Sequence, residues 1–267
     1  MTQMPDPALA RKRFAAVPLR YILPNLVTLL ALCLGLTSIR FAMEGRIETA
    51  VQAIIAAAVL DALDGRIARA LKGTSKFGAE FDSLADFVDF GVAPALVLYM
   101  FSLSEMKSAG WFAVMVFAIA CALRLARFNV AIDDPNKPAW MGNFFVGMPA
   151  PAGAIVGLMP IYFNLLGLQH SHDFVPYEIV YTLFVALLMV SRIPHFSGKS
   201  LGRVPREYII LVLFGVAATL LLLATYPFEV LVALTMSYLL MLPFSVRSYR
   251  RHIKADQAAP QDISGQP

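Results

Sequence analysis

Residues 59–95, VLDALDGRIARALKGTSKFGAEFDSLADFVDFGVAPA, combine two apolar helical segments with an unusual number of acidic residues. The acids are Asp61, Asp64, Asp82, Asp86 and Asp89. Asp61 and Asp64 have i, i+3 spacing, and Asp82 and Asp86 have i, i+4 spacing, so each pair shares one helix face. Because the connection between the two segments is short, we expect them to pack as antiparallel helices whose four carboxylates converge at one end.

Four converging carboxylates cannot all stay ionised without a proton or a cation between them. The open alternatives are therefore protonation of some carboxyl groups or a bound divalent metal. Oxygen ligands in this number suit Mg²⁺, Mn²⁺ or Ca²⁺. Asp89 lies outside both spacings, and we expect it to be a solvated residue near a helix end.

The composition indicates a polytopic membrane protein. Of the 267 residues, 58% are hydrophobic and only 15% are charged, whereas a soluble domain has about 25% charged residues. A membrane-spanning helix needs about 20 mostly apolar residues, and eight runs qualify as candidates. They are residues 21–41, 49–71, 81–101, 110–130, 149–168, 175–193, 208–226 and 228–246. We expect an all-α polytopic membrane helix bundle of about eight spans.

The basic residues predict the orientation in the membrane. With the N-terminus inside, 19 of the 22 lysines and arginines fall on the inner side, as the positive-inside rule requires of cytoplasmic segments. Both termini and the acidic cluster should then be cytoplasmic, which fits a multi-pass protein of a bacterial inner membrane. The net charge of +4 is accounted for by topology and anionic lipid, so no nucleic-acid partner is expected.

Four parts of the chain are expected from this pattern. Residues 1–20 form a basic cytoplasmic leader, either an interfacial helix or a disordered segment. Residues 21–199 hold the first six candidate spans, and residues 200–254 add two lipid-facing helices. Residues 255–267 are expected to be a disordered tail.

Small residues accompany the acids. Gly65 and Ala68 leave one helix surface bare, Gly78 opens the next helix, and Arg69 can reach a phosphate. Small residues on membrane helices also serve helix packing, which is the alternative explanation. Their combination with the spaced carboxylates favours a ligand that approaches the backbone.

These residues resemble a known family. The pattern Asp61-x-x-Asp64-Gly65-x-x-Ala68-Arg69, followed after eight residues by Gly78-x-x-x-Asp82-x-x-x-Asp86, is similar to the complete motif of the CDP-alcohol phosphatidyltransferases. The resemblance covers the first six spans, and no motif position departs from it.

The resemblance implies an activity and assigns roles. Members transfer a CDP-linked lipid group to an alcohol and release CMP, usually as homodimers. Their fold is a six-helix membrane core, which would make residues 21–199 the catalytic core and place the last two helices outside it. Two divalent ions, Mg or Mn, would be held by Asp61, Asp64, Asp82 and Asp86, and Asp86 would also be the base. The CDP moiety would contact Gly65, Ala68, Arg69 and Gly78, with Asn25 and Thr28 of the first span as further candidates.

Other stretches are similar to one branch of the family, the phosphatidylserine synthases. They include ALRLARFN (122–129), FFVGMPAPAGA (144–154) and MVSRIPHFSGK (189–199). Within the first, Arg124, Arg127 and Asn129 are candidates for binding the acceptor, because an arginine fork matches a free amino-acid carboxylate. The resemblance thus implies CDP-diacylglycerol and L-serine as substrates. A positive-inside role is the alternative for each arginine.

Two other functions stay open. The acceptor could be glycerol 3-phosphate, inositol phosphate or choline within the same family. The intramembrane acids could instead belong to an ion-coupled transporter, although such sites lie near the midplane and these acids lie at one membrane face.

Overall fold

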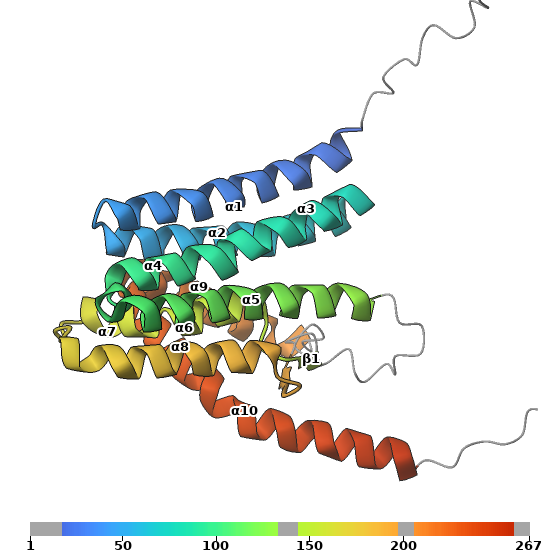
Figure 1. Cartoon of the computed structure of the whole chain (residues 1–267). Helices are drawn as coiled ribbons and strands as arrows, with labels where there is room; N and C mark the ends of the chain where they lie inside the picture. Colours follow the sequence, from blue (N-terminus) through green and yellow to red (C-terminus); the bar gives the residue numbers. More distant parts are fainter. Residues whose placement is uncertain (1–17, 133–143, 197–205, 259–267) are drawn as a thin grey trace, which may run out of the picture.

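The structure is a computed structural model that describes residues 18–132, 144–196 and 206–258 (Figure 1). Almost all of it is helical. The main helices are α1 (Leu19–Met43), α2 (Ile47–Ala70), α3 (Lys76–Phe87), α4 (Ala93–Phe101), α5 (Lys107–Ile132), α6 (Ala150–Gly157), α7 (Met159–Leu165), α8 (Val175–Val190), α9 (Ile209–Thr225) and α10 (Pro227–Ala258). Short helical turns are η2 (Val88–Val92), η3 (Leu103–Met106), η5 (His172–Phe174) and η7 (Arg206–Tyr208), and the strands are β1 (Phe144–Val146) and β2 (Pro194–Phe196).

The expected all-α membrane bundle is confirmed. Among the residues that the structure describes, five helical stretches are long and apolar enough to cross a bilayer: Ile22–Met43, Lys76–Phe101, Leu103–Ala131, His172–Val190 and Pro227–Ile253. The apolar helices Ala150–Leu165 and Ile209–Thr225 are shorter. Helix α2 has the length of a span, but its second half carries charged residues, including Asp61 and Asp64.

The fifth expected span is not one helix. Helix α6 ends at Gly157, and α7 begins two residues later with Pro160 in its first turn. Proline has no N–H to donate and clashes with the preceding turn, so a continuous helix through this point is unfavourable. The expected run over residues 149–168 therefore folds as two short helices.

Helices α3 and α4 form one continuous span with a widened turn between them. Residues Val88–Val92 adopt a π-helical turn. Pro94 stands in the first turn of α4, where its missing N–H cannot complete the regular hydrogen-bond ladder. Such π turns occur often at functional sites, because they change the direction of nearby side chains.

The bundle places the acidic segment at one end of two packed helix pairs. Helix α1 packs along α2, and α5 packs along α8. The end of α2 and the start of α3 lie at the same end of the molecule as the β1–β2 pair (Figure 1). These two strands are antiparallel, with Phe145 opposite His195, and they were not expected from the sequence.

The last helix is longer and better integrated than the sequence suggests. Helix α10 continues to Ala258, beyond the start of the tail expected from residue 255, while residues 259–267 lie outside the described part. Helix α10 packs against α7 and β2. It therefore belongs to the bundle and is not only a lipid-facing addition.

One close approach of backbones yields a stability prediction. A Cβ added at Gly110 of α5 would overlap the carbonyl oxygen of Leu103. Overpacking costs about 1–3 kcal/mol, which outweighs the gain of up to about 1 kcal/mol from replacing a helical glycine by alanine. We expect Gly110→Ala to lower the Tm in detergent by roughly 2–4 °C or more.

Gly215→Ala in α9 is the matched control. Within the described residues, no atom lies within 4 Å of a Cβ placed at Gly215. This variant should leave the Tm unchanged or raise it. An unchanged Tm for Gly110→Ala would contradict the packing of α5 on η3.

Candidate active site

The connection between α2 and α3 holds the two acidic helices close together. Ser75 caps α3, since its Oγ accepts a hydrogen bond from the Gly78 N–H at 3.0 Å. Gly73 packs against the start of α1, where a Cβ would overlap the carbonyl oxygen of Arg20. Side-chain capping satisfies an N–H that otherwise lacks a partner at the start of a helix. The short connection therefore keeps the end of α2 near the start of α3, but the two helices do not pack along each other: α2 packs on η2 and α4, and α3 packs on α1.

The predicted carboxylates come together. Asp61, Asp64 and Asp82 each offer one carboxylate oxygen, and these three oxygens lie within 4.8 Å of one another. Asp86 lies beside this group of three, within interaction range of the carboxyl groups of Asp61 and Asp82. Three or four carboxylate oxygens at this separation are the donor set that hard divalent cations prefer. The residues present therefore fit a divalent metal site.

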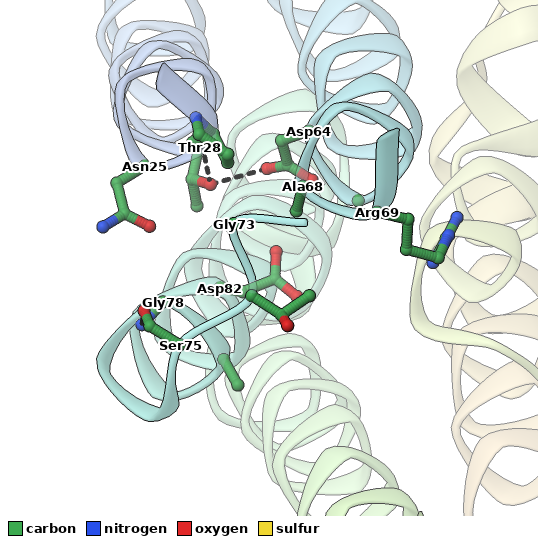
Figure 2. A pocket seen from close by; sticks show the side chains of 13 residues that line it. Asn25, Thr28, Asp64, Ala68, Arg69, Gly73, Ser75, Gly78 and Asp82 are labelled. Atoms are coloured by element: carbon green, nitrogen blue, oxygen red, sulfur yellow. Dashed lines mark hydrogen bonds between the residues drawn. The ribbon is translucent and has the colours of Figure 1, made fainter. Parts of the chain in front are cut away.

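Helix α1 completes one side of the cluster. The Thr28 hydroxyl donates to Asp64 Oδ2 at 2.7 Å and also lies 3.1 Å from the carbonyl oxygen of Pro24. Figure 2 shows this link between α1 and α2. Thr28 and Asp64 are both about 4% exposed. Thr28 thus orients one of the carboxylates from a helix that carries no acid of the cluster.

The small residues border an open pocket beside the acids. The pocket is lined by Pro24, Asn25, Thr28, Asp64, Gly65, Ala68, Arg69, Gly73, Thr74, Ser75, Gly78, Ala79 and Asp82 (Figure 2). All six residues that were assigned to CDP binding belong to this lining. The motif positions therefore share one cavity with two of the cluster's carboxylates.

The two motif glycines have different surroundings. A Cβ at Gly78 would lie only 2.9 Å from Asn25 Oδ1 and 3.1 Å from Ser75 Oγ. Within the described residues, a Cβ at Gly65 would meet only the Arg69 guanidinium, at 3.7–3.9 Å. Packing within the chain therefore explains why position 78 is a glycine, whereas Gly65 keeps space open on the pocket side of α2. This difference favours a ligand near Gly65.

The expectation for Asp89 is wrong. Asp89 lies in the π turn η2 and is only 1% exposed, not solvated. Its Oδ1 has no hydrogen-bond partner among the described residues. That oxygen occupies the space where a Cβ of Gly35 would stand on α1. No local feature of the sequence indicates this burial, because it depends on the π turn and on a glycine of another helix.

The two candidate acceptor arginines have different surroundings. Arg127 donates to the backbone carbonyls of Val190 (2.6 Å), Ser191 (3.0 Å), Met189 (3.2 Å) and Val146 (3.2 Å). It thereby joins the C-terminal end of α8 to β1. These bonds involve both terminal nitrogens of the guanidinium and hold it against the backbone.

Arg124 faces the acids. It is 7% exposed and lies within electrostatic range of the carboxyl groups of Asp86 and Asp61. Its guanidinium carbon is 5.1 Å from the centre of the Phe128 ring. The third candidate, Asn129, donates from Nδ2 to Ser83 Oγ at 2.9 Å and so connects α5 to α3. Of the three, Arg124 is the buried cation beside the carboxylate cluster.

Sequence reasoning missed one residue near Arg124. Tyr238 of α10 also lies within electrostatic range of the Arg124 guanidinium. Its hydroxyl is 2.7 Å from Nδ1 of His195 in β2. A tyrosine in a distant apolar helix carries no sequence signal for such a contact.

Comparison with known proteins agrees with the motif. A sequence model of the family described as CDP-alcohol phosphatidyltransferase matches residues 21–193. A CDP-diacylglycerol–serine O-phosphatidyltransferase of Mycobacterium leprae is 42% identical over 234 residues, which are 86% of this chain and 76% of the relative.

Two more distant relatives carry the same name. The protein of Helicobacter pylori strain 26695 is 34% identical over 73% of this chain and 80% of its own length. The protein of Bacillus subtilis is 33% identical over 66% of this chain and 91% of its own length. The acidic cluster, its pocket and the family match lie in the same part of the chain, and the protein belongs to the CDP-alcohol phosphatidyltransferase family.

Proposed function

We propose that this protein transfers the phosphatidyl group of CDP-diacylglycerol to L-serine, giving phosphatidylserine and CMP. The observation that carries the proposal is the convergence of Asp61, Asp64 and Asp82 at the pocket lined by the family motif. Relatives at 33–42% identity that are named as serine transferases support this choice of acceptor.

The cluster would hold two divalent ions, Mg²⁺ or Mn²⁺. Asp61, Asp64, Asp82 and Asp86 would be the protein ligands, and Thr28 would orient Asp64 through its hydrogen bond. Bound ions would neutralise the diphosphate of CDP-diacylglycerol and stabilise CMP as the leaving group.

Asp86 is the proposed general base. Its carboxylate takes the proton of the serine hydroxyl, and the hydroxyl oxygen forms a bond to the phosphorus that carries diacylglycerol. The bond from this phosphorus to the bridging oxygen breaks, and CMP leaves with that oxygen. The pocket residues Gly65, Ala68, Arg69 and Gly78, with Asn25 and Thr28, would hold the CDP moiety and align the diphosphate.

Arg124 is the proposed partner of the serine carboxylate. It is a buried cation within electrostatic range of Asp86, so a carboxylate held there would bring the serine hydroxyl toward the base. A planar guanidinium binds a carboxylate through two parallel hydrogen bonds. Asn129 lies on the same helix and would border this acceptor site while its amide holds Ser83.

The proposal extends to the setting of the enzyme. The chain would lie in a bacterial inner membrane with both termini and the active site at the cytoplasmic face, where the basic residues gather. It would act as a homodimer, with residues 21–199 as the catalytic core. A site at the membrane boundary suits one lipid substrate and one water-soluble substrate.

Release of labelled CMP from CDP-diacylglycerol tests the function directly. Purified protein is supplied in turn with serine, glycerol 3-phosphate, inositol phosphate and choline. We expect serine to give the highest kcat/KM. Release with another acceptor alone would reject serine while keeping the family chemistry, and no release with any of them would reject the enzyme.

The carboxylate cluster predicts that turnover requires a divalent metal. Treatment with EDTA should abolish CMP release, and Mg²⁺ or Mn²⁺ added afterwards should restore it. A thermal melt of the EDTA-treated protein serves as the control for folding. Full turnover of protein shown to be free of metal by elemental analysis would contradict the proposal.

Removing the proposed base should affect catalysis more than folding. Asp86→Asn preserves the volume of the side chain but cannot take the proton, so kcat should fall by about 100-fold or more. Asp173→Asn, which changes an exposed residue of η5, is the matched control and should retain normal turnover. Near-normal kcat for Asp86→Asn at an unchanged Tm would reject Asp86 as the base.

Substitutions of Arg124 and Arg127 should have different effects on serine binding and on stability. Arg124→Lys keeps the charge but removes the fork, so we expect the KM for serine to rise roughly tenfold to a hundredfold while that for CDP-diacylglycerol stays constant. Arg127→Lys loses hydrogen bonds to four carbonyls and should mainly lower the Tm. An unchanged serine KM for Arg124→Lys, measured with each substrate varied in turn, would move the carboxylate site elsewhere.

A further inference from the structure

A second cavity lies at the end of the bundle opposite the acidic cluster. It has a volume of about 480 Å³ and is bordered by the end of α4, by α7 and by the start of α8. The acids lie near the start of the α3–α4 span, whereas the cavity is lined by Phe101, the last residue of that span (Figure 1). Ligand pockets typically measure about 300–1,000 Å³. The lining shares no residue with the pocket beside the acids, so a ligand bound here would be separate from the reaction.

Aromatic and aliphatic side chains form most of the cavity wall. The aromatic ones are Phe101, Phe163, Phe174, Tyr177 and Tyr181. Tyr177 and Tyr181 are one turn apart on α8, so their rings share a helix face. Tyr177 is 73% exposed and Phe174 is 56% exposed, and the cavity is therefore open at its side. Because both residues belong to a stretch that can cross a bilayer, this opening faces lipid.

The wall carries one formal charge, the carboxylate of Glu178. Neither lysine nor arginine is among the described residues that line the cavity. The Glu178 side chain is 12% exposed, and its Oε1 lies 3.3 Å from His170 Nδ1. Its Oε2 accepts a hydrogen bond from the Ser102 hydroxyl. A carboxylate has about four lone-pair positions, so Glu178 can still accept hydrogen bonds from a ligand.

A second carboxylate beside the cavity makes this corner more negative. His170 Nε2 lies 3.1 Å from Glu105 Oε1, and His172 Nδ1 lies 2.7 Å from Glu105 Oε2. The group joins the turn η3 to the connection between α7 and α8. In the described part of the chain, the only ion-pair partners of Glu105 and Glu178 are these histidines. Two carboxylates attract a cation and repel an anion, so this corner favours a ligand with a cationic group.

Aromatic rings beside a carboxylate are a pattern that binds ammonium groups. A cation is attracted to the face of an aromatic ring, and proteins hold quaternary ammonium ligands in this way. A small soluble amine would leave the apolar wall, which includes Met159 and Phe163, without contact. A phospholipid offers both an ammonium group and an acyl chain. The cavity lies at the membrane boundary, because one span ends at Phe101 and another begins at His172.

We propose that this cavity binds a membrane phospholipid whose headgroup carries an ammonium group. Glu178 faces the ammonium together with the rings of Phe174 and Tyr177, and an acyl chain occupies the apolar wall of α7. The site is additional to the transfer reaction, and it does not depend on which acceptor alcohol the enzyme uses.

The main test measures lipid retention by native mass spectrometry. The purified protein is incubated with equal amounts of phosphatidylethanolamine and phosphatidylglycerol that carry the same acyl chains. We expect the ethanolamine lipid to be retained preferentially. Glu178→Gln should weaken its retention about tenfold, the loss expected for a hydrogen bond to a charged group, without strengthening that of the glycerol lipid.

Glu44→Gln is the matched control for the loss of a carboxylate. Glu44 follows α1 at the same end of the molecule (Figure 1), where it forms ion pairs with Arg40 and Arg46 outside the cavity. This variant should leave the retention of both lipids unchanged.

A second pair of variants tests the aromatic wall at exposed positions. Tyr177→Ala changes an exposed ring, so folding should not depend on it. Retention of the ethanolamine lipid should fall about twofold to fivefold, as expected for an exposed cation–π contact. Tyr208→Ala changes a 53% exposed tyrosine of η7 outside the cavity and should leave retention unchanged. The Tm without added lipid is the folding control for every variant.

Three outcomes would overturn the proposal. Equal retention of the two lipids by the unmodified protein, or a preference that Glu178→Gln leaves intact, rejects the ammonium site. Displacement of the lipid by an equal concentration of soluble phosphoethanolamine rejects a lipid as the ligand. If a second copy of the chain covers the cavity, Tyr177→Ala will weaken the dimer and leave lipid retention unchanged, which also rejects the proposal. Should Glu178→Gln fail to fold, Tyr177→Ala decides the question.

Discussion

The repulsion among four carboxylates in a small volume at the end of a membrane bundle governs the rest of this structure. Ionised acids so close together are unfavourable unless protons or cations lie between them, and the folding energy must come from their surroundings. The bundle supplies it through local devices: the Ser75 cap, the close packing of Gly73 on α1, and the Thr28 bond to Asp64. These contacts hold the ends of α1, α2 and α3 together around the carboxylates.

The prediction of the acidic cluster rested on the spacing of residues along a helix, which is a local property. The positions of Asp61, Asp64, Asp82 and Asp86 followed from it, and the structure brings their carboxyl groups together. The eight apolar runs predicted an all-helical fold. They did not predict the break before Pro160, because hydrophobic periodicity carries no information about the backbone N–H that proline lacks. Burial of Asp89 was also out of reach, since it requires the π turn and Gly35 of another helix.

Contacts between distant segments were the least predictable part of the site. Arg124 and Arg127 are nearly equivalent in sequence, three residues apart on one helix. They differ because the carbonyls at the end of α8 happen to surround Arg127, while Asp86 and Tyr238 lie near Arg124. Such differences depend on tertiary packing, in which positions far apart in the chain determine what each side chain meets.

The ending of α8 has a consequence for the bilayer itself. This helix has 16 residues, so it is about 24 Å long at 1.5 Å per residue, and the turn η5 extends the apolar stretch back to His172. The carbonyls at its end accept hydrogen bonds from the Arg127 guanidinium. Strand β2 follows the helix and pairs with β1. Irregular backbone is tolerated there only because protein surrounds it. The span can therefore end within the bundle without exposing unpaired carbonyls to lipid.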